Sequence, residues 1–583
     1  MRRPRPQQHV APTQRCTRGQ ATGLLALVTT VAPLLFLLRS PLSALSGTTH
    51  VAAVRGTGSP AGAAAAACAA LPQQRDAQAG APVPLGGPAV AVPSGRAVWR
   101  MCEPTARAPA ADGGTLFIES VSVRAAGVEG GGNVTVVELA VFHEGREFAE
   151  GAIFHAAQTG RAANASYWLA GGRRRVLPCT VRLPPQLMPD VTLLSCEAPG
   201  LDIPVPRPGA APWELQLRWN YSRGGEGDGD DDGSSGSGGV TYGARIWMCA
   251  AAVPFMYACP QAGQVAQPRR VPRLGVCVSS MSNKHGTLTP KLVVDFIEYY
   301  RLLGVHHIAI HMRPDAAASV GAALTAAYAA DAPHFVFEAI PSGYVTADPA
   351  NLDRWPYYDQ AGTLTSCVGH MRGQVSWLGM LDIDEWLVDG NGTVTTPLTT
   401  MLTAWGCGAM TEDGAPRVHA TACNRSTTPP GAARLSCVHM QRDAVAAPFV
   451  PGGEYPGGAT ALQYFRDALL ATPNNLLSPK AWCDPDAIAA TWVHHAVAIP
   501  GATAVIVPEV NATFRHFTSY FNAREQSGAF PRSADAAFAA QLAAASAARL
   551  AHPACVTATS TATAAMAAAA ASAAAAAMTT DDV

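Results

Sequence analysis

The hydrophobic pattern changes character about half way along the chain. Between about residues 113 and 253, apolar and polar residues alternate in runs such as Thr115–Arg124, Val134–His143 and Trp213–Trp219. Alternation with a period of two is typical of strands that bury one face, and glycines and prolines separate the runs. Residues 113–253 are therefore predicted to form a small all-β, sandwich-like accessory domain.

From residue 271 onward, short apolar runs alternate with amphipathic helices. Leu274–Ser279 has the composition of a buried strand, and Thr289 followed by Pro290 is a typical helix start. Gly304 is a typical helix end. The predicted apolar stripe of this helix comprises Leu292, Phe296, Tyr299 and Leu303.

The same alternation of strand and helix continues downstream. Strands are expected at His307–Met312 and His334–Ile340, with an Ala-rich helix between them. A further helix is expected from Gln360 to about Arg372. Strand–helix–strand order of this kind predicts parallel strands joined by right-handed crossovers.

Residues 21–38 carry no charged side chain. As a helix this segment is about 27 Å long, enough to cross a thin bilayer. Five arginines precede it and only Arg39 follows closely, which predicts a single-pass type II anchor with a cytosolic tail at 1–20. Residues 39–112 are predicted to be a disordered stem. A cleaved signal peptide and an organelle transit peptide are the alternatives.

Charge and cysteine content narrow the class of protein. A formal net charge of −1 gives no electrostatic basis for binding nucleic acid. Fourteen cysteines, together with six Asn-x-Ser/Thr sequons, fit a lumenal or extracellular environment. The pairing of the cysteines cannot be read from their positions. Residues 532–583 are predicted to be a dispensable Ala-rich tail, although 533–550 has a helical pattern.

The candidate chemistry lies in the run Trp377–Val388. If one strand continues through this run, Asp382 and Asp384 share a face while Ile383 points into the core. Two carboxylates at the carboxyl end of a strand are suited to Mn²⁺ or Mg²⁺ holding a diphosphate. The adjacent pairs His306–His307 and His494–His495 are not interpreted as zinc sites, because neighbouring strand residues face opposite ways.

Three separated motifs resemble the core of family 92 glycosyltransferases. They are Leu274–Val278, the helix segment Phe296–Val305, and the series Cys367, Arg372, Trp377 and Asp382-Ile-Asp-Glu-Trp-Leu387. The resemblance covers about residues 270–525. It implies a GT-A-like, Rossmann-type α/β domain with a mixed sheet at 270–531, a metal-binding Asp-x-Asp motif and a Golgi type II anchor. It also implies inverting transfer of galactose from UDP-galactose.

The resemblance and the chemistry together suggest roles for individual residues. Asp382 and Asp384 are expected to bind the metal, with His516 completing its shell. Arg372 and Lys480 are candidates for binding the donor diphosphate. Glu385 is a candidate general base or an orienting residue, with Asp359 and Glu454 as alternative bases.

The chain is therefore expected to be a metal-dependent hexosyltransferase, anchored in the Golgi membrane by one N-terminal helix. Its expected partners are a nucleotide-sugar donor and a glycan or polysaccharide acceptor. One alternative is a transferase of the same fold that uses another nucleotide sugar. The other is a non-catalytic, glycan-binding membrane protein built on a decayed transferase domain.

Overall fold

The computed structural model describes part of the chain. The described residues are 60–70, 89–103, 106–109, 115–127, 133–144, 163–168, 174–182, 191–199, 206–222, 239–260, 267–281, 288–332, 334–342, 360–389, 397–402, 434–445, 460, 470–474, 479–491, 494–499, 501–507, 512–516, 536–558 and 560. All of them belong to one compact unit, Gly58–Val583.

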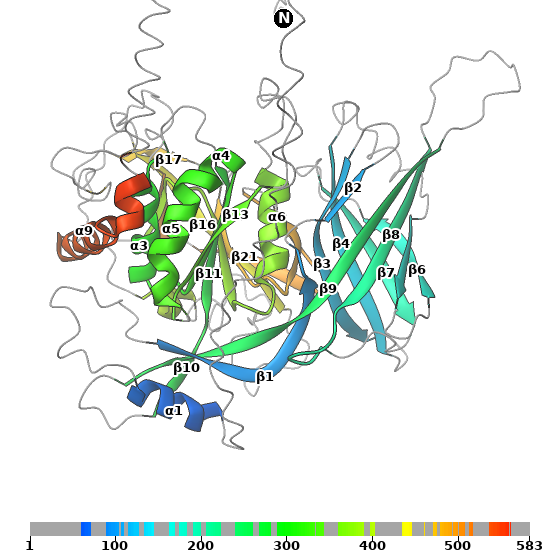
Figure 1. Ribbon diagram of the computed structural model, residues 1–583, viewed down its shortest axis with the longest axis horizontal. Helices are drawn as coiled ribbons and strands as arrows, with labels where there is room; N and C mark the ends of the chain where they lie inside the picture. The colour runs from blue at the N-terminus through cyan, green and yellow to red at the C-terminus, as the bar shows by residue number, and fades with distance from the viewer. Residues whose placement is uncertain are drawn as a thin grey trace, which may run out of the picture. The chain divides into compact units, whose positions relative to one another are not determined.

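Antiparallel strands from the first half of the chain form one continuous sheet, which we call the first sheet (Figure 1). Its hydrogen-bonded order is β1-β9-β8-β5-β6-β7-β4-β3-β2, with β10 paired to β9. The strands are β1 (Ala89–Met101), β2 (Ala106–Pro109), β3 (Thr115–Gly127), β4 (Asn133–Glu144), β5 (Ala163–Trp168), β6 (Arg174–Arg182), β7 (Val191–Pro199), β8 (Trp213–Ser222), β9 (Gly239–Ala258) and β10 (Arg269–Val271).

The first sheet folds over its own hydrophobic core. Strand β2 returns to pack against β9, and β3 packs against β1. Between these layers lie Trp99, Ile118, Leu139, Leu215 and Ile246, all buried. The region predicted to be sandwich-like is thus built from one continuous ladder of strands.

Disulfides join neighbouring elements of this region. Cys179–Cys196 links β6 to β7, and Cys102–Cys249 links the end of β1 to β9. Cys68–Cys259 ties α1 (Pro60–Ala70) to the end of β9. Because α1, β1 and β2 all fall within residues 39–112, the prediction of a disordered stem is wrong for these parts.

The remaining strands form the second sheet, with the order β13-β12-β11-β14-β18-β16-β22-β15 and with β17 and β21 paired to β16. Strands β13, β12, β11 and β14 are mutually parallel, whereas β18 runs antiparallel to β14. The strands are β11 (Leu274–Met281), β12 (His307–Met312), β13 (Val336–Pro341), β14 (Trp377–Leu381), β15 (Glu385–Asp389), β16 (Arg434–Val445), β17 (Leu470–Asn474), β18 (Lys480–Cys483), β21 (Ala502–Val507) and β22 (Ala512–His516). A separate hairpin pairs β19 (Ile488–Thr491) with β20 (Ala496–Ala498).

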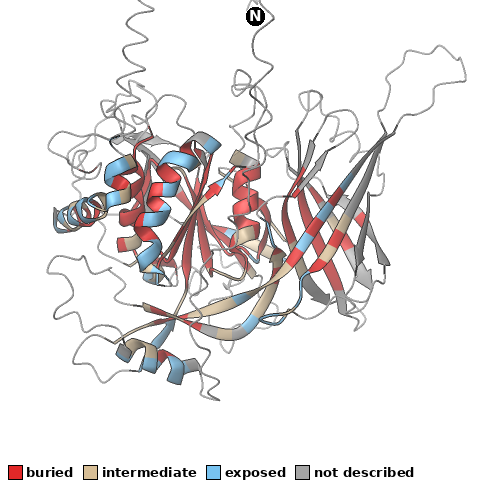
Figure 2. Cartoon of the chain, in the orientation of Figure 1, coloured by how far each residue is buried: buried red, intermediate tan, exposed pale blue. Residues whose placement is uncertain are grey.

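Helices cover both faces of the parallel strands. Helix α3 (Pro290–Leu302) and the continuous helical segment α4 (Pro314–Ala316) to α5 (Ala322–Tyr328) pack on the face that carries Ile308 and Ile310. Helix α6 (Gln360–Met371) packs on the opposite face. Figure 2 shows the parallel strands as buried, with exposed positions on the outer helices.

The start and end of α3 follow from single residues. The Thr289 Oγ1 accepts a hydrogen bond from the Leu292 backbone N–H at 3.3 Å, and Pro290 occupies the first turn. Gly304 then takes a φ of 90°, which a side chain disfavours. This predicted helix is confirmed.

The predicted fold class is wrong for the described chain as a whole. An α/β, Rossmann-type GT-A-like domain with an N-terminal transmembrane helix would alternate strand and helix throughout residues 270–531. Instead, strands β16 to β22 follow one another in residues 434–516, and the described residues lie in strands more often than in helices. The helical crossovers end with α6, because the later apolar runs are short and pair with each other.

The predicted location in the Golgi membrane is contradicted as well. Among the described residues, no helix has both the length and the apolar character needed to cross a bilayer. Because of this finding the type II membrane prediction is not retained. The proposed anchor at 21–38 itself lies outside the described residues.

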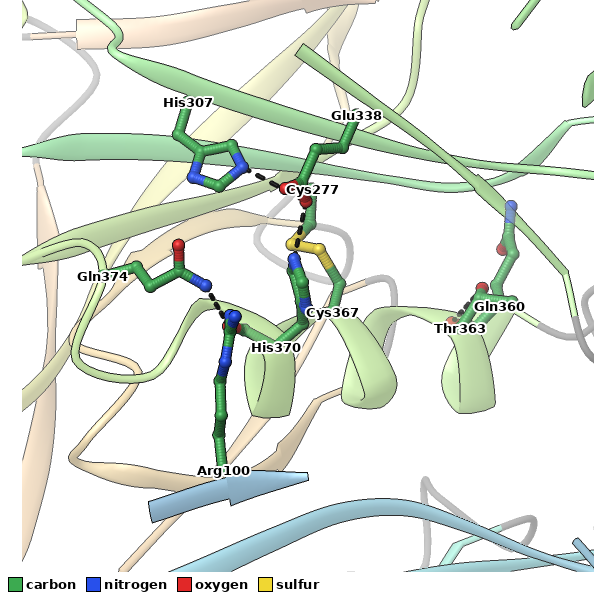
Figure 3. The surroundings of a disulfide bond; sticks show 9 residues. All are labelled: Arg100, Cys277, His307, Glu338, Gln360, Thr363, Cys367, His370 and Gln374. Carbon is green, nitrogen blue, oxygen red and sulfur yellow. Dashed lines mark hydrogen bonds and ion pairs between the residues drawn. A yellow bond between two sulfur atoms is a disulfide. The ribbon is translucent and has the colours of Figure 1, made fainter. Parts of the chain in front are cut away.

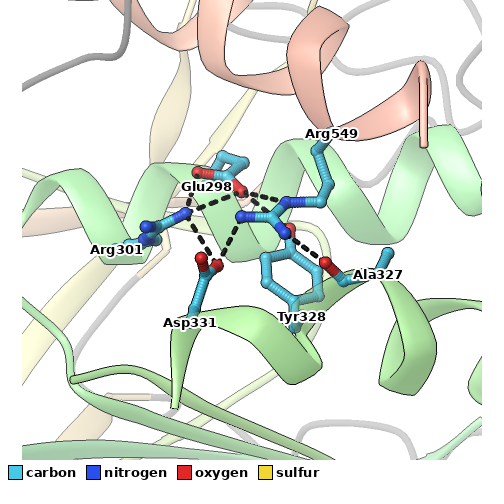
Figure 4. Close-up of polar contacts among 6 residues, drawn as sticks. All are labelled: Glu298, Arg301, Ala327, Tyr328, Asp331 and Arg549. Atoms are coloured by element: carbon cyan, nitrogen blue, oxygen red, sulfur yellow. Dashed lines mark hydrogen bonds and ion pairs between the residues drawn. The ribbon is translucent and has the colours of Figure 1, made fainter. Parts of the chain in front are cut away.

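Helix α9 (Ala536–Leu550) lies in the segment predicted to be a dispensable tail, yet it is part of the core. Phe538 packs edge-on against Tyr299 of α3, with ring centroids 5.5 Å apart, and Leu542 is fully buried. Figure 4 shows Arg549 at the end of α9 reaching Glu298, Asp331 and the Ala327 carbonyl. The prediction that this tail is dispensable is therefore wrong for α9.

We expect Leu542→Ala to lower the free energy of unfolding by about 2–5 kcal/mol, because it leaves a cavity between α9 and α3. Alanine is the stronger helix former, so the loss cannot come from helix propensity. Urea unfolding of the full chain measures the effect, with exposed Ala547→Ser as control. Equal stability of Leu542→Ala and the parent chain would contradict the packing of α9.

Stability is also expected to depend on the protonation of His439 on β16. Burial, reinforced by His495, lowers the pKa of His439 to about 4. The unfolded chain, with a pKa near about 6.5, takes up the proton first, so the native state loses stability as the pH falls from about 6.5 to about 4. The loss approaches about 3 kcal/mol.

Urea midpoints of the parent chain and of His439→Leu should therefore diverge across this range, with the variant less sensitive to acid. His334→Leu, at an exposed position, is the matched control and should follow the parent. Identical pH dependence of His439→Leu and the parent would refute the contribution of His439.

Candidate active site

The acidic motif forms a turn rather than the continuation of a strand. Strand β14 ends at Leu381, and β15 starts at Glu385. The Glu385 backbone N–H donates to the Asp382 carbonyl at 3.1 Å, which closes the turn. The predicted alternation of Asp382 and Asp384 along one strand is therefore wrong, although Ile383 is buried as expected.

The turn follows the carboxyl end of a parallel strand in the interior of the second sheet. Strand β14 has parallel β11 on one side and antiparallel β18 on the other. Sites for ligands in open sheets with parallel strands gather beyond the carboxyl ends of the strands, where the connectivity changes. The acidic turn occupies such a position.

Lys480, the first residue of β18, reaches into the turn and pairs with two carboxylates. Its Nζ lies 2.7 Å from Asp382 Oδ2 and 3.0 Å from Glu385 Oε2. The lysine and Glu385 side chains are fully buried, whereas that of Asp382 is 23% exposed. Burial opposes the charge on Lys480, but Asp382 and Glu385 outweigh it and raise the lysine pKa above its ordinary value.

Both the side chain and the backbone of Glu385 are fixed by hydrogen bonds. Its Oε2 accepts a hydrogen bond from the Asp382 backbone N–H at 3.0 Å, and its carbonyl accepts one from the Tyr300 hydroxyl at 2.8 Å. Trp386 packs on Tyr299, with ring centroids 4.5 Å apart. These contacts support the orienting role for Glu385 over that of a general base.

The other two predicted metal ligands are Asp384, which is part of this turn, and His516, whose backbone lies on the strand beside it. Asp384 is buried within the turn. The His516 backbone pairs with Glu385 in the ladder of β22 and β15, while its side chain lies outside the description. The alternative bases Asp359 and Glu454 are also outside the described residues.

Arg372 is engaged elsewhere. Its guanidinium donates to the Ser120 Oγ of the first sheet at 2.7 Å, to the Pro485 carbonyl at 3.1 Å and to the Ile488 carbonyl at 2.9 Å. With three nitrogens committed to protein acceptors and the side chain buried, Arg372 connects the end of α6 to the first sheet and to the hairpin β19–β20. Its predicted contact with a diphosphate stays a prediction.

The acidic turn carries part of a donor set for a hard divalent cation; among the described residues, the group of three converging metal-binding side chains lies elsewhere. Asp382 and Asp384 supply carboxylate oxygens, the ligands preferred by Mg²⁺ and Mn²⁺. Asp382 retains solvent exposure, so a ligand can reach it. The Lys480 ammonium adds one compact positive charge beside these acids, of the kind that binds phosphate oxygens.

A second group of metal-binding side chains was missed in the sequence. His307, Glu338 and His370 each place one donor atom within 4.8 Å of the others. The side chains of His306 and His307 do point to opposite faces of the strand. The other two members of the group, Glu338 and His370, come from the neighbouring strand β13 and from α6. Only the pairing of β12 with β13, beneath α6, could have revealed the group.

No protein-family model matches the chain, and no curated protein matches it. The resemblance to family 92 glycosyltransferases accordingly stays a prediction that depends on the motifs quoted above.

We expect Lys480→Met to destabilise the protein by about 3–5 kcal/mol, because it leaves the buried Glu385 carboxylate without its cation. Chemical denaturation measures this loss. The triple variant Lys480→Met, Asp382→Asn, Glu385→Gln removes the charges together and should recover most of it. A Lys480→Met chain as stable as the parent would show that the ion pairs contribute little.

Proposed function

We propose that this protein is a metal-dependent glycosyltransferase that moves a sugar from a nucleotide-sugar donor to a hydroxyl of a glycan or polysaccharide. The family resemblance implies UDP-galactose as the donor and transfer of its galactose with inversion. The observation that carries the proposal is the acidic turn Asp382–Asp384, with Lys480, at the carboxyl end of β14.

Each residue of the turn has a defined task in such a transfer. Asp382 and Asp384 would hold the divalent cation, which neutralises the negative charge that develops on the leaving diphosphate. Lys480 lies beside the same carboxylates and adds positive charge where the diphosphate binds. Glu385 positions Asp382 through the hydrogen bond to its backbone N–H.

The reaction itself is a single displacement. The acceptor oxygen forms a bond to the anomeric carbon, the bond from that carbon to the diphosphate oxygen breaks, and the acceptor proton passes to a base. Five disulfides among the described residues fit a protein that folds in an oxidising environment, where glycans are also built.

One observation favours a second candidate, a non-catalytic glycan-binding protein. The Lys480 ammonium already lies between Asp382 and Glu385, so the turn has an internal cation. If that ion pair persists when a nucleotide sugar is offered, the turn is a structural element. The two candidates differ in whether UDP binding depends on a divalent cation.

The deciding experiment is turnover of a panel of UDP-sugars by the purified full chain, with Mn²⁺ and with a chelator. We expect one donor to be hydrolysed or transferred in the presence of Mn²⁺ only. Asp382→Ala and Asp384→Ala should each lower the rate by at least about 100-fold, because each removes a ligand of the cation.

Glu103→Gln, at an exposed acid just after β1, is the matched control and should leave the rate unchanged. A folded parent chain that neither turns over a donor nor binds UDP in a metal-dependent way would refute the transferase and leave the glycan-binding candidate.

A further inference from the structure

The group formed by His307, Glu338 and His370 lies between the second sheet and α6, and we call it the His-Glu-His group. His307 is the first residue of β12, Glu338 lies on the adjacent parallel strand β13, and His370 is in the last turn of α6. Figure 3 shows the three side chains converging beside the disulfide Cys277–Cys367. Three elements distant in sequence thus direct donor atoms to one point.

The distances are close to those of a chelating site. Glu338 Oε2 lies 2.5 Å from His370 Nε2 and 3.3 Å from His307 Nε2. Two ligands of a tetrahedral ion with bonds of about 2.0–2.1 Å are roughly 3.3 Å apart. The first distance must therefore widen by less than about 1 Å, and the 35% exposed Glu338 side chain has room to move.

The state of the ligands also suits a metal. The His307 ring is buried, and its Nδ1 has no hydrogen-bond partner among the described residues. Burial lowers the pKa of His307, which favours the neutral imidazole that metals bind. Burial acts to raise the pKa of Glu338, but contacts with both histidines hold it well below its ordinary value.

Two arginines oppose the binding of a cation here. Arg100 donates to the His370 carbonyl at 3.3 Å and Arg273 to the Gln374 carbonyl at 3.4 Å, and the charges of both act on Glu338. Both of these contacts are with backbone carbonyls and not with the donor atoms of the three side chains. Their charge should make binding weaker than at a site without them.

We propose that His307, Glu338 and His370 bind a divalent transition-metal ion, with Zn²⁺ the best fit. Two imidazoles and one carboxylate are a known zinc set that leaves a fourth position for water or another ligand. The ion would link β12, β13 and α6 next to the disulfide that joins β11 to α6.

This metal site is separate from the acidic turn. Val278 of β11 pairs with Ile310 of β12 and with Leu381 of β14. His307 lies three residues before Ile310, whereas Asp382 lies one residue after Leu381. At about 3.3 Å per residue and about 4.8 Å per strand, the two sites are roughly 16 Å apart. The inference therefore does not depend on the transferase proposal.

The test is metal binding by the full chain after treatment with a chelator. We expect one equivalent of Zn²⁺ in competition with a chromophoric chelator, and a visible spectrum of tetrahedral Co²⁺ with nitrogen ligands. Glu338→Gln, which keeps the size of the side chain, and His370→Asn should each weaken binding by at least about tenfold.

Two control variants separate this site from others. His334→Asn removes an exposed histidine on the same stretch of chain and should leave the affinity unchanged. The double variant Asp382→Ala, Asp384→Ala should keep the ion even if it loses donor turnover. No Zn²⁺ bound by the folded parent chain, or equal affinity in Glu338→Gln, would overturn the proposal, and neither result would touch the transferase.

Discussion

One buried charged side chain connects α6 to the first sheet and to the hairpin β19–β20. Arg372 directly follows α6. Its guanidinium donates to Ser120 of the first sheet, to the Pro485 carbonyl just before the hairpin β19–β20, and to the Ile488 carbonyl at the start of β19. A buried guanidinium without partners is costly, so the folded state needs all three acceptors in place. Small residues allow the approach, since a side chain at Gly369 would meet Ser120, and one at Gly373 would meet Val98.

With α6 fixed in this way, both candidate sites acquire their geometry from opposite faces of the second sheet. On the α6 side, Cys367 is joined to Cys277 and His370 is held over β12 and β13. On the other side, Tyr299 and Tyr300 of α3 hold the strand that follows the acidic turn. The side chains with candidate chemistry are thus anchored by helices on either side of the same parallel strands.

The sequence predicted best what a few neighbouring residues decide. Helix α3 follows from Thr289, Pro290 and Gly304, and the strand at His307–Met312 has the expected bounds. The turn at Asp382–Asp384 was missed because no glycine or proline marks it. Lys480, nearly a hundred residues later, stabilises it instead. The disulfide pairs, the His-Glu-His group and the continuous ladder of the first sheet likewise depend on strand order, which local patterns do not contain.

The place of α9 bears on the order in which the protein is made and folded. The face of α3 that carries Tyr299 is covered by Phe538, and Glu298 meets Arg549, about 250 residues further on. During synthesis that face stays open until residue 550 has left the ribosome. The first sheet, whose strands all lie before residue 272, can pair much earlier. A nascent chain can therefore carry a paired β region beside an uncovered apolar helix, a state in which chaperones would have a surface to bind.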